Sequence, residues 1–546
     1  MSEVCFKKYR RTTTAVKVGN ILIGGNNPIV VQSMVATATT DIDGCVEETL
    51  KIVEAGGEIV RFTAASVAEA VAIGKIREKL HERGCTVPLV ADVHFNPKAA
   101  FAAAELIEKV RINPGNFIDP RAKLDGVEYS DMQYEQELVR LDSEFCRLLD
   151  ICKAHRTALR IGVNHGSLSD RIMSKYGDTI EGMCESAMEF LRICRRENFH
   201  NVVVSIKSSN VVVMVDAYRA MASTMESENM HYPLHLGVTE AGEGEDARVK
   251  SALGIGTLLS EGIGDTIRVS LTEPSWCEID VARKIVDYAS KTCSNSLNIN
   301  EKKIVLDRVN RKSTPKVISN LTPYSDEVAA DLSELQGAEF ATYEQYLEIV
   351  NSLEDEKKVP IFTYNDDDFS DRLSTILLKS EKSGICSQIA LKKRYKESDK
   401  LLYIIKLAVD FGSLLLSGRG DYIVVDSNDE KEGSEWQLSS IFSLLQASRA
   451  RISRTEFISC PSCGRTQFDI AQTVKMVKER CSSFKGVKIA VMGCNVNGPG
   501  EMADADFGYI GAGKGKVNLY KGRELIEKGV VASEAVEKLV ELIKHG

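Results

Sequence analysis

The sequence predicts an α/β protein whose N-terminal part is a TIM (β/α)8 barrel. Two observations support this prediction: eight short β-branched runs alternate with stretches of helical period, and each run finishes on polar residues. The intervening helices, such as 44–55 and 66–83, carry apolar residues three or four positions apart and end before a glycine. We expect the strands at residues 28–34, 58–63, 88–94, 109–113, 158–164, 201–207, 233–240 and 265–270.

The ends of these runs form a second pattern. In a barrel, the carboxyl ends of all strands meet at one rim, which is where barrel enzymes keep their active sites. Five cations from five strands would converge there, and such a ring implies a multiply charged anion. A single strand-end arginine could equally be solvated or paired with a carboxylate. The polar residues at the strand ends are Gln32, Arg61, Asp92, His94, Arg111, Asn113, Arg160, Asn164, Lys207, Glu240, Arg268 and Ser270.

The length of 546 residues predicts more than one domain. We expect the barrel at 1–292, an inserted α/β domain at 293–435 and a C-terminal domain at 436–546. The insert contains strand-like segments at 359–364 and 421–426 and a helical stretch at 401–416. It carries no constellation of His, Cys or paired carboxylates, so we expect a structural role for it.

Composition excludes several classes of protein. No run approaches the ~18 apolar residues that a membrane span needs, and the N-terminus lacks the apolar segment of a signal peptide. The formal net charge of −9 argues against general nucleic-acid binding. Fourteen cysteines, mostly single within apolar segments, fit reduced thiols. We therefore expect a cytoplasmic protein.

The C-terminal part places three thiols on glycine- and proline-rich turns. Strands at 455–460 and 487–494 deliver Cys460, Cys463 and Cys494, and Glu501 follows seven residues after the last cysteine. Cys-x-x-Cys with a distant third cysteine is typical of a metal or iron–sulfur site. Two alternatives stay open: a structural zinc site that also uses Cys481, and a redox dithiol that needs only the first pair. The helical setting of Cys481 favours a place in the core.

Eight motifs in order resemble one known family, the (E)-4-hydroxy-3-methylbut-2-enyl diphosphate synthases of the non-mevalonate isoprenoid pathway, in their longer three-domain form. The match covers the barrel and the C-terminal domain. The motifs are Val60-Arg-Phe-Thr63, Ala91-Asp-Val-His-Phe95, Arg111-Ile-Asn-Pro-Gly-Asn116, Arg160-Ile-Gly-Val-Asn-His-Gly-Ser-Leu168, Ser205-Ile-Lys-Ser-Ser209, Gly237-Val-Thr-Glu-Ala-Gly242, Cys460-Pro-Ser-Cys-Gly-Arg-Thr466 and Met492-Gly-Cys-Asn-Val-Asn-Gly-Pro-Gly-Glu501.

The resemblance implies an iron–sulfur oxidoreductase that reduces 2-C-methyl-D-erythritol 2,4-cyclodiphosphate with two electrons and expels a hydroxyl as water. It implies a C-terminal α+β iron–sulfur domain whose [4Fe-4S] cluster is held by Cys460, Cys463, Cys494 and Glu501. Glu240 would contact the departing hydroxyl, or else neutralise the arginines. The implied substrate-binding residues are Arg61, His94, Arg111, Asn113, Arg160, Asn164, Lys207, Arg268 and Ser270.

The resemblance also implies partners. A reduced ferredoxin or flavodoxin would supply the electrons, because no dinucleotide-binding motif is present. In the two-domain form of the family, the cluster domain serves the barrel of a partner chain, so a homo-oligomer is expected there. Here the insert could replace the partner's barrel as a scaffold, which would let the site close within one chain.

Overall fold

A computed structural model describes residues 10–119, 128–294, 308–311, 313–319, 330–332, 335–352, 359–365, 369–385, 387–395, 397–425, 434–461, 463–464, 466–495, 498–502, 504–513 and 515–545. The chain divides into two compact units, each described by itself below. The barrel unit comprises residues 11–243, 263–283 and 455–546, and the insert unit comprises residues 1–10, 244–262 and 284–454.

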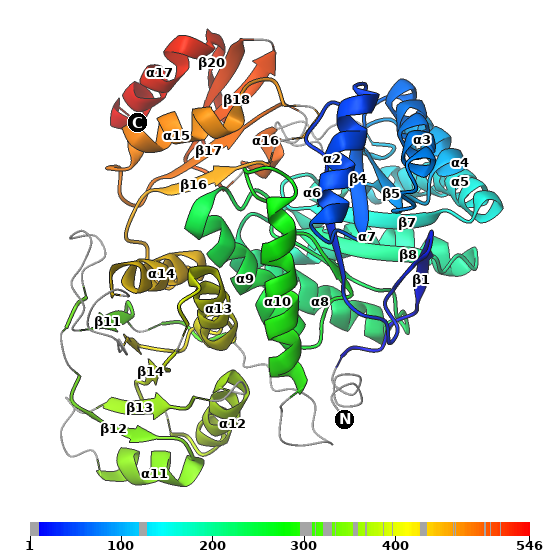
Figure 1. Ribbon diagram of the computed structural model, residues 1–546. Coiled ribbons are helices and arrows are strands. Elements are labelled where there is room, and N and C mark those ends of the chain that lie inside the picture. The colour runs from blue at the N-terminus through cyan, green and yellow to red at the C-terminus, as the bar shows by residue number, and fades with distance from the viewer. Residues whose placement is uncertain are drawn as a thin grey trace. The chain divides into compact units, whose positions relative to one another are not determined.

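Eight parallel strands form the barrel, as the sequence predicts (Figure 1). Their order is β8-β7-β6-β5-β4-β3-β10-β9, and a parallel bridge between Val204 and Leu234 brings the two ends of this series together. The strands are β3 (Val30–Met34), β4 (Ile59–Ala64), β5 (Leu89–Val93), β6 (Lys109–Ile112), β7 (Ala158–Asn164), β8 (Val202–Lys207), β9 (His235–Leu236) and β10 (Thr266–Ile267).

Helices follow the strands and form the outer layer (Figure 1). Their starts are set by capping side chains: Asp41 and Ser66 accept backbone N–H groups, and Ser130 forms a capping box with Gln133. The helices are α2 (Ile42–Glu54), α3 (Val67–Glu82), α4 (Pro97–Leu106), the 3-10 turn η1 (Pro114–Asn116), α5 (Asp131–His155), α6 (Asp170–Tyr176), α7 (Ile180–Arg196), α8 (Val211–Ser227) and α10 (Cys277–Ser294).

A short hairpin closes the amino-terminal end of the barrel. Its strands β1 (Val16–Val18) and β2 (Ile21–Ile23) pair antiparallel. Their buried side chains pack with Val30, Ile59 and Val90 in one apolar cluster. Apolar side chains of the hairpin and of the strand starts therefore close this end of the barrel.

The insert unit contains a fully parallel five-stranded sheet in the order β11-β15-β14-β13-β12. Helix α9, which follows β9 in the chain, belongs to this unit, where it packs against α13. The elements are β11 (Lys316–Ile318), β12 (Gly337–Phe340), β13 (Val359–Thr363), β14 (Ala390–Lys392), β15 (Tyr422–Val424), α9 (Gly244–Ser260), α11 (Tyr343–Ser352), α12 (Phe369–Lys382), α13 (Lys400–Leu416) and α14 (Ser434–Ala447). The α/β character of the insert is confirmed, and the domain boundaries stay a prediction.

The C-terminal part of the barrel unit is an α+β layer structure. Its sheet has the order β16-β17-β18-β19-β20 (Figure 1). Strands β16, β17 and β18 are parallel, and β19 pairs antiparallel with both β18 and β20. The elements are β16 (Glu456–Ser459), β17 (Lys488–Met492), β18 (Phe507–Gly513), β19 (Lys516–Lys521), β20 (Glu524–Val531), α15 (Ile470–Cys481), α16 (Gly498–Glu501) and α17 (Ala532–His545). Among the described residues, no helix has the length and apolar character to cross a membrane.

Candidate active site

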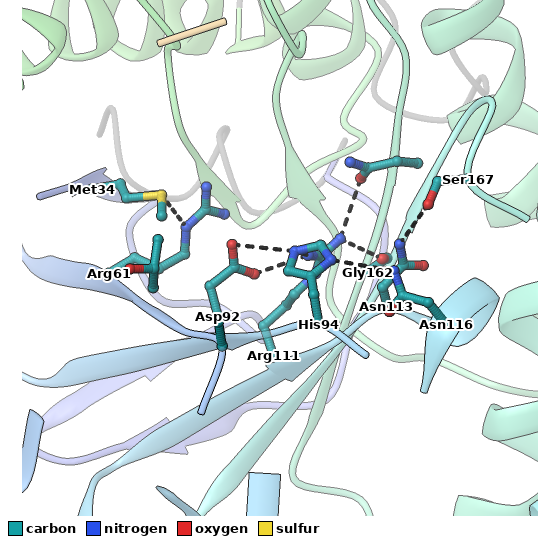
Figure 2. Close-up of polar contacts among 12 residues, drawn as sticks. Met34, Arg61, Asp92, His94, Arg111, Asn113, Asn116, Gly162 and Ser167 are labelled. Carbon is teal, nitrogen blue, oxygen red and sulfur yellow. Dashed lines mark hydrogen bonds and ion pairs between the residues drawn. The ribbon is translucent and has the colours of Figure 1, made fainter. Parts of the chain in front are cut away.

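Arg111 on β6 is the centre of a buried polar network at the rim (Figure 2). Its Nη1 donates to Asp92 Oδ1 at 2.9 Å and contacts His94 Nε2 at 2.5 Å. Its Nη2 donates to the carbonyl of Gly162 at 2.7 Å and to Asn164 Oδ1 at 3.3 Å. Burial alone would raise the pKa of Asp92, but the charges of Arg111 and Arg61 outweigh it and hold this pKa well below its usual range.

Arg268 is also paired with a carboxylate. Its Nε and Nη2 donate to the two oxygens of Glu278 at 3.1 and 3.0 Å, and both residues are at most 3% exposed. Glu278 further accepts from the hydroxyl of Ser33 at 2.6 Å. This two-pronged bond fixes the plane of the guanidinium.

Three further cations, Arg61, Arg160 and Lys207, have no ion pair with a carboxylate among the described residues. Arg160 is 2% exposed, and its Nε and Nη1 have no hydrogen-bond partner within that part of the chain. Burial, together with neighbouring positive charges, lowers the pKa of Arg61 to about 10 and those of Arg160 and Lys207 well below their usual values. Such uncompensated buried charge is costly unless an anion binds there.

Cys460 and Cys463 follow β16, and Cys494 follows β17. The backbone N–H of Gly493 lies 3.2 Å from Cys460 Sγ, in donor geometry. Burial and the neighbouring Cys463 raise the pKa of the Cys460 thiol, with smaller contributions from Glu240 and Cys494. Cys460, Cys463 and Cys494 are each partly exposed.

Rim and cysteines line one cavity of about 90 Å³ within the barrel unit. All five predicted cations contribute to it: four lie on strands β4, β6, β7 and β8, and Arg268 directly follows β10. Its lining comprises Met34, Arg61, Asp92, His94, Arg111, Arg160, Asn164, Ser205, Lys207, Thr239, Glu240, Arg268, Ser270, Cys460, Pro461, Cys463, Met492, Cys494 and Gly498.

Close backbone approaches hold the cysteine loops against the rim. A Cβ on Gly464 would lie 2.8 Å from Thr63 Oγ1, and one on Gly166 would lie 2.0 Å from the carbonyl oxygen of Gly500. Thr272 Oγ1 lies 2.9 Å from Ser459 Oγ, beside the parallel bridge that joins Ala241 to Ser459. Glycine is therefore needed at both approaches, since any side chain would push the loops apart.

Comparison with known proteins gives a consistent result over the whole chain. Residues 13–283 match the GcpE TIM-barrel domain, and residues 456–545 match the GcpE protein C-terminal domain. The chain belongs to the GcpE family. It is 45% identical to the 4-hydroxy-3-methylbut-2-en-1-yl diphosphate synthase (flavodoxin) of Parabacteroides distasonis, covering 99% of this chain and 98% of that protein. The synthase of the same name from Leptospira interrogans is 40% identical over 99% of this chain and 97% of its own length.

Membership of the GcpE family makes the chain an oxidoreductase of isoprenoid biosynthesis.

Glu240 lines the same cavity as the cations and the cysteines. This residue is 2% exposed and adopts a left-handed backbone conformation with a φ of 51°. The hydroxyl of Thr239 donates to its Oε1 at 3.1 Å. A non-glycine residue in this conformation costs of order 1 kcal/mol, and such strain is common at functional sites.

Two of the residues that the sequence singles out, Asn113 and Cys481, are not among the described residues that line the cavity. Asn113 does not line the cavity: its Nδ2 donates to Ser167 Oγ at 3.1 Å and its Oδ1 accepts from the N–H of Gly115 at 3.1 Å, so it holds its own loop. Glu501 ends α16, and its side chain lies outside the described part of the structure. Cys481 is fully buried in the apolar core of the C-terminal layer, as its helical setting predicts.

Sequence reasoning missed two residues that organise the site. Met34 lines the cavity from the end of β3, where a methionine reads as a core residue. Glu278 lies on α10, and the pattern of polar residues at the strand ends does not include it. Among the described residues, no three His, Cys, Asp or Glu side chains are arranged to hold a single metal ion.

Proposed function

We propose that the chain catalyses the reductive ring opening of 2-C-methyl-D-erythritol 2,4-cyclodiphosphate to (E)-4-hydroxy-3-methylbut-2-enyl diphosphate. One observation carries the proposal: three cations that have no carboxylate partner among the described residues line the same cavity as three cysteines. Anion-binding groups and redox-metal donors thus meet where a phosphorylated substrate could contact both. Counted on neutral forms, two electrons and two protons enter and one water leaves.

The cations would hold the diphosphate. Arg61, Arg160 and Lys207 supply charge that is not already neutralised, and each guanidinium can donate two parallel bonds to phosphate oxygens. Asp92, His94 and Asn164 hold the guanidinium of Arg111. These three residues would therefore act on the substrate partly by orienting Arg111. Ser270 lines the same wall and would donate its hydroxyl.

The cysteines fit a [4Fe-4S] cluster by the chemistry of their donors. Iron–sulfur clusters are held by thiolates, and the N–H of Gly493 beside Cys460 Sγ is the kind of contact that stabilises a sulfur carrying negative charge. We assign Cys460, Cys463, Cys494 and Glu501 as its ligands. When bound, such a cluster supplies electrons one at a time. The glutamate oxygen is a harder donor than thiolate and binds iron less durably.

Glu240 is our candidate acid for the departing hydroxyl. Loss of hydroxide at neutral pH needs a proton donor, and the carboxyl of Glu240 lines the cavity together with Cys460. We expect Glu240→Gln to lower kcat far more than it raises KM. Equal loss of affinity and turnover would instead favour the simpler role of neutralising the cations.

The relatives named above are flavodoxin-dependent by name, so we propose a reduced flavodoxin, or a ferredoxin, as electron donor in the cytoplasm. Anaerobic purification, iron and sulfide analysis and a visible spectrum test the cofactor, and turnover of the cyclic diphosphate with reduced flavodoxin tests the reaction. Cys494→Ser should lose iron and activity, whereas the matched variant Cys481→Ala should keep both. One zinc per chain without iron would overturn the assignment in favour of a structural zinc site on a phosphate-binding barrel.

We also propose that the site closes within one chain, since rim and cysteine loops of the same barrel unit line the cavity. Mixing Glu501→Ala chains with Arg111→Ala chains tests this. The mixture should stay inactive. Restored activity would show that each site is shared between two chains of a homo-oligomer.

A further inference from the structure

Met34 lies between two of the rim arginines. Strand β3, which carries it, runs between β4 and β10, and Met34 is the direct Cα partner of Arg61 on β4. Arg61 Nε donates to Met34 Sδ at 3.0 Å (Figure 2), and Arg268 Nη1 donates to the same sulfur at 3.5 Å. One thioether therefore contacts the guanidinium of Arg61 on β4 and that of Arg268, which directly follows β10.

These three side chains are shielded from water. Met34 and Arg268 are each 3% exposed, and Arg61 is 8% exposed. Within the described part of the chain, the sulfur supplies the only side-chain hydrogen bond to Arg61. Arg111 and Arg268, in contrast, are each bonded to a carboxylate.

The chemistry of the acceptor matters here. A thioether is a weak, neutral acceptor, so it can engage an N–H group without cancelling the charge of the guanidinium. It occupies Nε of Arg61 and leaves both terminal nitrogens of that group available. A carboxylate in the same place would also orient the arginine, but it would neutralise the charge that an anionic ligand needs.

We propose that Met34 is a positioning residue for anion binding: its sulfur aims Arg61 and Arg268 at one diphosphate group and adds no negative charge beside either guanidinium. The inference rests on the proposed function only because that function supplies the ligand, a diphosphate. Met34 touches the arginines and acts through them, so its effect belongs in the binding of phosphate rather than in the chemical step.

Three substitutions separate this role from simple filling of space. Met34→Leu keeps volume and removes the acceptor, Met34→Gln keeps a neutral acceptor, and Met34→Glu introduces a charged one. Binding of inorganic pyrophosphate, measured by calorimetry on the cluster-loaded enzyme, should weaken about tenfold in Met34→Leu, remain within about threefold in Met34→Gln and weaken by about a hundredfold in Met34→Glu. The KM for the cyclic diphosphate should follow the same order, with kcat changed much less.

A space-filling role predicts the opposite order, because an apolar core tolerates leucine for methionine better than it tolerates an amide. Tight binding by Met34→Leu with weak binding by Met34→Gln would overturn the proposal, and so would an equal loss in all three variants. Met188→Leu, a fully buried methionine change on α7, is the matched control and should leave pyrophosphate binding unchanged. Turnover by the unaltered enzyme decides the proposed function separately, since pyrophosphate binding requires no reaction.

Discussion

Two buried charged clusters, one in each unit, differ in how their charges are balanced. In the insert unit, Asp410 is 1% exposed and accepts from three donors: Lys393 Nζ at 2.8 Å, Tyr395 Oη at 2.8 Å and Tyr288 Oη at 2.9 Å. In the barrel unit, Arg61, Arg160 and Lys207 are also buried, and they have no carboxylate partner among the described residues. A structural cluster is stable when its charges are paired and hydrogen-bonded within the protein. An anion site instead needs positive charges that no carboxylate of the protein neutralises.

The same contrast occurs inside the rim itself. Arg268 is neutralised by Glu278, and Arg111 by Asp92, so those two arginines are fixed whether or not a ligand is present. Arg160 lacks such a partner within the described part of the chain. Balanced residues of the rim therefore provide the frame, and unbalanced ones provide the affinity.

The largest expected effect is on stability, in the insert cluster. Asp410→Asn keeps the shape of the side chain but removes the negative charge that lies 2.8 Å from the buried ammonium of Lys393. We expect the free energy of unfolding of this unit to fall by about 3–4 kcal/mol. Trp436, which stacks edge-on against Tyr403 with ring centroids 4.9 Å apart, reports unfolding by fluorescence once the second tryptophan, Trp276, is replaced by Phe.

The control for this change removes both charges. Asp410→Leu combined with Lys393→Met should recover most of the stability, because no buried charge is then left alone. Turnover should survive Asp410→Asn at temperatures where the protein stays folded. A stability equal to that of the unaltered protein would show that the insert cluster is not balanced in the way that we describe.

The next effect is on activity, at the unbalanced part of the rim. Arg160→Met should lower kcat/KM by about a hundredfold, which corresponds to the loss of one charged contact to phosphate. The free energy of unfolding should stay the same or rise, since the substitution removes an uncompensated buried charge. Steady-state kinetics and denaturant unfolding of the same preparation measure both quantities.

Arg268→Met is the matched control within the same ring. It also removes one cation, but it leaves Glu278 buried without its partner, so it should lose about 3 kcal/mol of stability as well as activity. Opposite stability effects of the same chemical change would establish the distinction between frame and affinity residues. Equal destabilisation by both variants would remove it.

The sequence predicts much of this arrangement and misses the rest for identifiable reasons. Strand periodicity and the barrel rule place Arg61, Arg111 and Arg160 at one rim, because parallel strands end together. The pairing of Arg268 with Glu278 depends on how α10 packs, which no local pattern encodes. The hydrogen bond from Asn113 to Ser167 likewise depends on a loop conformation that the strand pattern does not encode. Met34 was missed because methionine is normally an apolar core residue, and only the flanking guanidinium groups give its sulfur an acceptor role.

The smallest expected effect concerns a cation deeper in the barrel, Lys109 at the start of β6. It is fully buried, and its Nζ has no hydrogen-bond partner among the described residues. Burial first, and then the charges of Arg160 and Arg61, lower the pKa of Lys109 well below its usual value of 10.5. Between the lowered pKa and that usual value, the unfolded chain binds one more proton than the folded protein.

The contribution of Lys109 to the free energy of unfolding therefore rises with pH across that window, because raising the pH removes the proton that only the unfolded chain holds. Lys109→Met abolishes this contribution and also removes an unsatisfied buried group, so it should be about 1–2 kcal/mol more stable than the unaltered protein at pH 7. The advantage should shrink as the pH approaches 10, while every other titrating group cancels in the difference. Denaturant unfolding of both proteins at pH 7, 8.5 and 9.5 measures it. If the difference in free energy of unfolding between the two proteins does not change with pH, Lys109 keeps its proton in the folded barrel. Lys109 would then be a further charged residue available to bind an anion.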